Sequence, residues 1–77
     1  MKRNSTEFKN MRIRLGKRIQ EIRIEKGMTQ ESLSAISGLD RVSIGYIEQG
    51  KRAARLSTLL ILAKSLKVKM ADFFDGF

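Results

Sequence analysis

Residues 29–51 read TQESLSAISGLDRVSIGYIEQGK, and this stretch predicts two short helices joined by a tight turn. Thr29 and Asp40 are good N-cap residues, because their side-chain oxygens can accept a free backbone N–H of a helix's first turn. Gly38 and Gly50 each follow a helical stretch, and glycine is the residue best suited to the left-handed conformation that ends a helix. The stretch therefore contains two start signals, each followed by a stop signal.

The apolar residues of this stretch give each short helix a buried side. Leu33 and Ile36 form the apolar side of the first helix, and Ile44 with Ile47 forms that of the second. The outer side of the second helix then carries Arg41, Val42, Ser43 and Tyr46. A packed back and a front of donor, methyl and aromatic groups are what reading the major groove of DNA requires. An ordinary αα-hairpin has the same turn and is the alternative.

Four motifs in this order carry a resemblance to a known family. They are GMTQESL at residues 27–33, SGL at 37–39, IxxIExGK at 44–51 and LxxLAxxL at 59–66. Together they resemble the helix-turn-helix of the XRE family, which includes the lambda-type phage repressors and Cro proteins. The resemblance covers roughly residues 11–74, and it implies an all-α, five-helix, lambda-repressor-like DNA-binding domain. Within the family, the short chain and the LDR at residues 39–41 look most like controller proteins of restriction-modification systems.

The resemblance also implies roles for the front of the second helix. Arg41 and Val42 match the positions of the family's first base-reading side chains, and Ser43 and Tyr46 lie one step further along. Arginine can bond two acceptors of one guanine, while valine offers only methyl contact, most suitably to a thymine. Tyr46 could touch either a base or a phosphate.

Two further roles follow from the same resemblance. Gln30 matches the family's phosphate-clamping glutamine, and it would lie where the free N–H groups of a helix end point the same way. Arg23 and Glu48 match a pair that forms a partly buried salt bridge between the first helix and the end of the recognition helix. The alternative for this pair is two unrelated surface charges.

The net charge of +8 is unevenly distributed. Residues 1–26 carry nine Lys or Arg against three Glu, and residues 51–69 carry six basic residues and no acid. Such a surface attracts a polyanion, of which nucleic acid is the usual one. In the loop that follows the second helix, three basic side chains suit contact with DNA phosphates: Lys51, Arg52 and Arg55.

The residues that are missing narrow the function. The 77-residue chain has neither cysteine nor histidine, which removes disulfides, thiolate metal sites and the commonest general base. We therefore expect no enzyme activity, metal, cofactor or small-molecule ligand. The longest apolar run, residues 59–63, is too short to span a bilayer, and the N-terminus lacks the apolar core of a signal peptide. A cytoplasmic location without membrane contact is expected.

The chain outside the helix-turn-helix predicts one flexible arm and one domain. Residues 1–8 are polar and unpatterned, as in a loose arm that could reach DNA or simply be solvated, and residues 9–77 form the single domain. From residue 9 to 26 the pattern is helical, with an apolar stripe and with Gly16 weakening the helix by up to ~1 kcal/mol relative to alanine. The stripe consists of Met11, Leu15, Ile19 and Ile22.

The C-terminal third predicts a fourth helix, capped by Ser57, and a short fifth helix at residues 70–74. The fourth helix is apolar beyond its core stripe, and Phe73 of the fifth belongs to the core. Four other apolar residues are candidates for a homodimer interface, because apolar patches on small proteins usually mark association. They are Leu60, Ile61, Phe74 and Phe77.

These features predict a sequence-specific transcriptional regulator that binds double-stranded DNA. A homodimer would place two recognition helices about 34–36 Å apart and read an inverted repeat. A restriction-modification controller protein or a phage-type repressor fits this description, and RNA polymerase is a further candidate partner. The alternative is an antitoxin or another protein-interaction module that uses the same fold.

Overall fold

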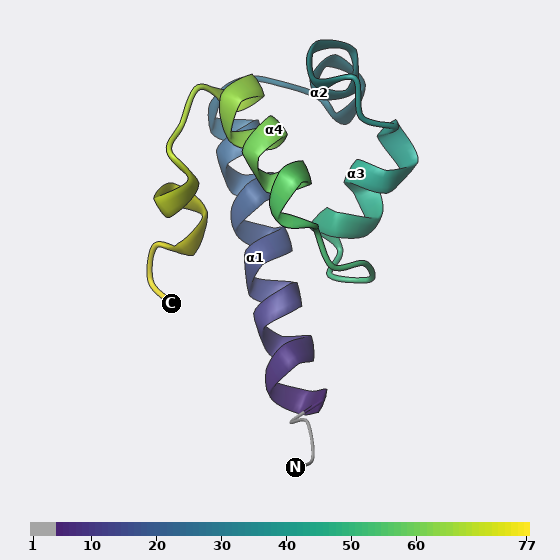
Figure 1. Ribbon diagram of the computed structural model, residues 1–77. Coiled ribbons are helices and arrows are strands. Elements are labelled where there is room, and N and C mark those ends of the chain that lie inside the picture. The colour runs from purple at the N-terminus through teal and green to yellow at the C-terminus, as the bar shows by residue number, and fades with distance from the viewer. Residues whose placement is uncertain (1–4) are drawn as a thin grey trace.

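The computed structural model describes residues 5–77, and every element within that range is helical (Figure 1). The elements are α1 (Ser5–Glu25), α2 (Gln30–Ser37), α3 (Arg41–Glu48), α4 (Leu56–Leu66) and a 3-10 helix, η1 (Met70–Phe74). The long helix α1 packs on α3 and η1, while α4 packs on α2 and η1. The first turns of α1 project past the other helices at the lower end of Figure 1. The predicted all-α fold is confirmed, with the fifth helix in 3-10 form.

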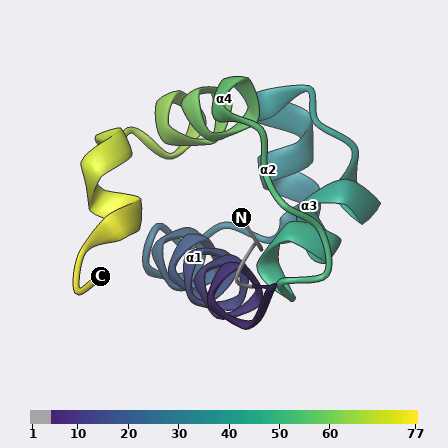
Figure 2. The same cartoon turned by 60° about the horizontal axis from the view of Figure 1, so that its bottom comes forward.

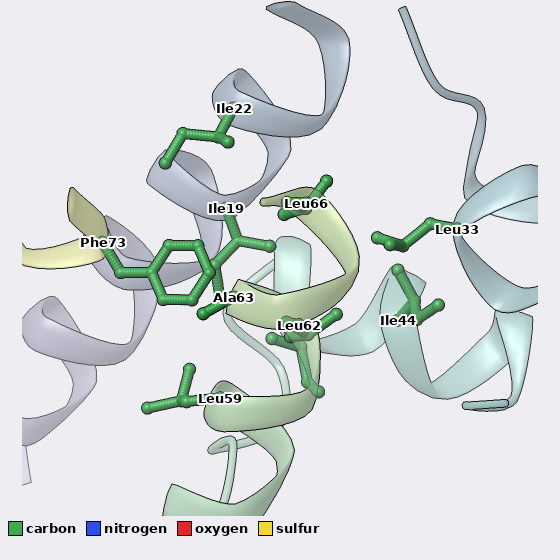
Figure 3. Packing of buried hydrophobic residues seen from close by; sticks show 10 residues of the cluster. Ile19, Ile22, Leu33, Ile44, Leu59, Leu62, Ala63, Leu66 and Phe73 are labelled. Atoms are coloured by element: carbon green, nitrogen blue, oxygen red, sulfur yellow. The ribbon is translucent and has the colours of Figure 1, made fainter. Parts of the chain in front are cut away.

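The core lies where α4 meets α2, α3, η1 and the second half of α1 (Figure 3). Phe73 is fully buried against α1 and α4, although it lies four residues from the end of the chain. Each fully buried side chain of this size contributes about 1.5–3 kcal/mol from the removal of apolar surface from water. The core residues are Ile19, Ile22, Leu33, Ile44, Ile47, Leu59, Leu62, Ala63, Leu66 and Phe73.

The predicted caps of the helix-turn-helix are confirmed. The Thr29 hydroxyl accepts the backbone N–H of Ser32 at 3.0 Å, and the Ser32 hydroxyl accepts the backbone N–H of Thr29 at 2.8 Å. One Asp40 carboxylate oxygen accepts the backbone N–H of Ser43 at 3.1 Å. Gly38 ends α2 with a φ of +78°, in the left-handed region. Local signals therefore determine the bounds of α2 and the start of α3.

Two predicted boundaries are wrong. The expected arm at residues 1–8 is helical from Ser5 onward, so α1 begins four residues earlier than predicted; residues 1–4 lie outside the described residues. Helix α4 begins at Leu56, with Arg55 at the cap position and no side-chain cap bond, so Ser57 is not its cap. Helix α4 therefore starts without the side-chain cap that the sequence predicted, because its free N–H groups can also be satisfied in other ways.

Two side chains assigned to apolar faces are exposed. Ile36 has 59% of its surface exposed, because α2 packs on α3 and α4 through the side that carries Leu33. Met11 is 41% exposed, because the first turns of α1 extend past the core that begins at Ile19. Ile13 and Ile24, which lie off the predicted stripe, are exposed as well.

Candidate functional site

Helix α3 has a buried back and an open front. Ile44 and Ile47 are only 1% and 5% exposed and face the core, where Figure 3 shows Ile44 directed toward Leu33 and α4. On the other side, Val42 is 50% exposed and Tyr46 is 40% exposed. Of the other predicted base-reading residues, Arg41 is exposed and Ser43 is half-buried. Three of the four predicted base-reading side chains are therefore exposed on the side of α3 away from the core, and Ser43 is partly covered.

Helix α3 is fixed by direct backbone contact with α1, which sequence reasoning missed. A Cβ added to Gly16 would lie 2.0 Å from the carbonyl oxygen of Ile47 and 2.9 Å from that of Glu48. Glycine is therefore required at this crossing, where side chains would hold the helices apart. The only sequence signal was a glycine inside a helical pattern, which we interpreted as a weakness of the helix.

The turn after α3 is held by the same helix. Gly50 adopts a φ of +74°, and a Cβ there would lie 2.7 Å from the Cγ1 atom of Ile13. Arg12 donates from its Nε to the carbonyl oxygen of Gly50 at 2.9 Å, which occupies a carbonyl that the helix end leaves free. The first turns of α1 thus anchor both the end of α3 and the basic loop that follows it. Sequence reasoning assigned Arg12 no role.

The predicted contact between Arg23 and Glu48 forms, with two hydrogen bonds in parallel. Arg23 donates from Nε to Glu48 Oε2 at 2.7 Å and from Nη2 to Oε1 at 3.0 Å. Both residues are buried, and Arg23 also donates to the carbonyl oxygen of Met28 at 2.8 Å. The pair therefore ties α1 to the last turn of α3 and to the loop before α2.

Gln30 belongs to the same network, which changes the interpretation of its predicted role. Its Nε2 donates to Glu48 Oε1 at 2.9 Å, so one of the two amide hydrogens is already used in a hydrogen bond within the protein. One amide hydrogen and the amide oxygen stay available, since a glutamine side chain has two donors and an acceptor. Gln30 is the first residue of α2, beside the free N–H groups of that helix. A phosphate contact there would have to share the amide with Glu48.

The basic loop lies beside the front of α3. Lys51 and Arg55 are exposed, as expected for side chains that contact DNA phosphates. Arg52 differs, because it donates from Nη1 to the hydroxyl of Ser43 at 2.8 Å, and its guanidinium lies 5.1 Å from the ring centroid of Tyr46. The loop is therefore in contact with two of the predicted base readers.

The four predicted dimer-interface residues are all partly accessible. Leu60 and Ile61 on α4 are 46% and 38% exposed, and Phe74 and Phe77 are 39% and 42% exposed. The two phenylalanines meet edge to face, with ring centroids 5.5 Å apart. Arg14 covers the Phe77 ring at 4.4 Å. Half of the predicted interface thus already has partners within the chain.

Two kinds of feature, a cluster of metal-ligating side chains and a membrane-spanning helix, are not found in residues 5–77. No group of three or more metal-ligating acidic, histidine or cysteine side chains occurs in this range. None of its helices has the length and apolar character that a bilayer span needs.

Comparison with known proteins agrees with this geometry. The family model HTH_3, described as helix-turn-helix, matches residues 19–73 and so includes α2, α3, α4 and most of η1. The chain belongs to the helix-turn-helix family. The resemblance that the sequence motifs carried is therefore confirmed, and the loop and α3 front described above belong to a helix-turn-helix protein.

Regulators and controller proteins are among the similar proteins. The transcriptional regulator PuuR of Escherichia coli is 39% identical over 60 residues, which is 78% of this chain but only 32% of PuuR. The control protein C.SmaI of Serratia marcescens is 38% identical over 63 residues, covering 82% of this chain and 75% of that protein. The restriction-modification controller protein C.Esp1396I, solved as a tetramer with its natural 35-base-pair operator, has a TM-score of 0.77, with 38% identity over 84% of this chain and 86% of that one.

Proposed function

We propose that this protein is a sequence-specific transcriptional regulator that binds double-stranded DNA as a two-fold homodimer. The observation that carries the proposal is the two-sided helix α3, with Ile44 and Ile47 anchored in the core and the opposite side open. A rigid helix with an accessible front is suited to the major groove, where base edges present distinct donor and acceptor patterns. Its start at Arg41 is fixed by the Asp40 cap.

The roles of the individual residues follow from their positions. Arg41 is exposed at the first position of α3, where a bidentate contact with guanine would discriminate by ~1–3 kcal/mol. Lys51 and Arg55 flank the helix and have no partner among residues 5–77, which suits phosphate contacts. Such contacts position the protein on the duplex and make binding salt-dependent.

A homodimer completes the recognition unit. The apolar residues of α4 and the C-terminal segment supply the interface, and two copies of α3 would then read half-sites about one helical turn apart. The similarity to C.SmaI and C.Esp1396I supports a narrower role as a restriction-modification controller protein, with RNA polymerase as a further partner during transcription. Genes for a restriction enzyme and a methyltransferase beside this one would support that role.

The test is selection of bound duplexes from a random pool. We expect an inverted repeat to be enriched, and we expect Arg41→Ala to lose the preference for one base pair in each half-site. Lys51→Ala is the matched control, because it removes a charge outside the front of α3 and should weaken all sequences alike. Failure to enrich any sequence, or an unchanged preference in Arg41→Ala, would contradict the proposal. Sedimentation of the complex gives its stoichiometry independently, with two chains expected per operator.

A further inference from the structure

The backbone after α3 directs Arg52 back over the helix. The carbonyl oxygen of Tyr46 accepts the N–H of Lys51 at 2.9 Å and that of Arg52 at 3.3 Å. With Gly50 in the left-handed region, the chain reverses within these residues. The side chain of Arg52 therefore starts beside the last turn of α3, although it belongs to the loop.

Its guanidinium group then joins two residues of the front. Ser43 and Tyr46 are three residues apart in α3, so they are neighbours on the same side of the helix. Arg52 donates to the Ser43 hydroxyl at 2.8 Å and lies 5.1 Å from the Tyr46 ring centroid. One planar cation thus holds a hydroxyl and an aromatic ring at the same time.

We propose that Arg52 is a positioning residue that determines base specificity by orienting Ser43 and Tyr46, instead of serving only as a phosphate contact. The inference rests on the proposed function, because it deepens the reading role of α3. Lys51 and Arg55 lie in the same loop, yet among residues 5–77 no side-chain hydrogen bond or ring contact joins either of them to α3, as a hydrogen bond and a ring contact join Arg52. The arrangement therefore distinguishes Arg52 from the other basic groups of the loop.

The hydrogen bonds that the Ser43 hydroxyl makes within the protein determine which groups of a DNA base it can contact. This hydroxyl lies 3.4 Å from Asp40 Oδ2, which can only accept, but this distance is longer than an ordinary O–H···O bond and by itself directs the hydroxyl proton only weakly. Arg52 donates to one of the two lone pairs of the oxygen, which leaves one lone pair free. Because Arg52 donates to this oxygen, the hydroxyl proton must turn away from the guanidinium and toward the Asp40 carboxylate, so Ser43 acts toward DNA as an acceptor. In the major groove its partner is then the amino group of adenine or cytosine.

The effect on Tyr46 is orientation. A cation over the face of a tyrosine ring is attracted by the ring's negative face, which limits the positions that the ring adopts. Tyr46 belongs to α3 and is 40% exposed, so part of its ring is accessible to solvent. Without Arg52 the ring would be free to choose other rotamers.

The experiment compares Arg52→Ala with Arg55→Ala, because each removes one positive charge from the same loop. We expect Arg55→Ala to weaken binding to all duplexes by a similar factor and to lower the salt slope by about one. Arg52→Ala should in addition lose, by about tenfold, the preference for adenine or cytosine at one position of each half-site. In a Ser43→Ala background, Arg52→Ala should cause no further loss of preference at that position.

A measurement without DNA tests the free protein. The chain contains one tyrosine and no tryptophan, so its tyrosine fluorescence reports on Tyr46 alone. We expect Arg52→Ala to change this signal and Arg55→Ala to leave it unaltered.

The outcomes distinguish a failure of the proposed DNA-binding function from a failure of the proposed role of Arg52. A wild-type protein that enriches no duplex contradicts the proposed function. A wild type that selects an operator, while Arg52→Ala and Arg55→Ala weaken all sequences alike, contradicts only the role of Arg52. An undiminished effect of Arg52→Ala in the Ser43→Ala background contradicts the proposed route through Ser43.

Discussion

Replacing Gly16 with alanine should destabilise the protein, although alanine is the better helix former. The new Cβ would lie 2.0 Å from the carbonyl oxygen of Ile47, a contact that only movement of α1 away from α3 relieves. Overpacking of this kind costs ~1–3 kcal/mol, and because the obstacle is backbone we expect the upper end of that range. The gain in helix propensity offsets ~1 kcal/mol. The expected net loss is about 2 kcal/mol of unfolding free energy, or about 8–16 °C in Tm for a domain of this size.

Gly45→Ala is the matched control, since Gly45 also lies inside a helix and is buried. A Cβ there would lie 3.6 Å from the side-chain oxygen of Gln30, an ordinary contact. We therefore expect this variant to gain up to ~1 kcal/mol from helix propensity. Urea unfolding followed by circular dichroism, with both variants and the wild type at equal protein concentration, measures the two changes.

The two substitutions should thus have opposite signs. A Gly16→Ala variant as stable as the wild type would show that α1 and α3 do not approach so closely. If both variants lost stability equally, the loss could not be assigned to the helix crossing. The reasoning from the 2.0 Å approach would be refuted in either case.

Three further changes test the same fold. Glu48→Ala strands the buried charge of Arg23 and should cost ~3–5 kcal/mol in urea unfolding, whereas the exposed Glu25→Ala should change stability by less than about 0.5 kcal/mol. Asp40→Ala removes the cap of α3 and should cost ~0.5–2 kcal/mol, while Asp40→Asn, which can still cap, should retain most of the stability; equal losses would contradict the cap. Phe73→Ala should cost ~3–5 kcal/mol, because its side chain is fully buried, and a thermal transition close to that of the wild type would show that η1 is not part of the folded core.

Local sequence signals predicted the helix-turn-helix well. The caps at Thr29 and Asp40 involve partners only three residues away, and the glycine at position 38 requires only its own backbone angle. These interactions are complete within one turn of chain, so no tertiary information is needed to expect them. At the start of α4 the side-chain cap is absent, and the predicted cap at Ser57 was wrong because Arg55 occupies the cap position.

The sequence predicted which side of α3 is exposed, but it did not predict the contacts around that side. Helical periodicity alone places Ile44 inward and Val42 outward, because residues three or four apart on a helix share a face and residues two apart do not. It does not show that Gln30 is bonded to Glu48 or that Arg52 lies over Tyr46. These contacts join segments whose approach depends on the turn after α3 and on the packing of α2.

The sequence by itself determined which stretches of this protein are helical, the inward direction of Ile44 and Ile47 on α3, and the basic character of the loop that follows α3. The helix crossing was decided only by tertiary structure, because it brings together Gly16 of α1 and Ile47 of α3, which are far apart in the chain. Gly16 is the clearest case: its missing Cβ is a small defect in an isolated helix and a requirement where two backbones touch. Helix propensity is a property of the residue type and can be read from the sequence, whereas the space around a residue depends on which other residues pack against it in the fold.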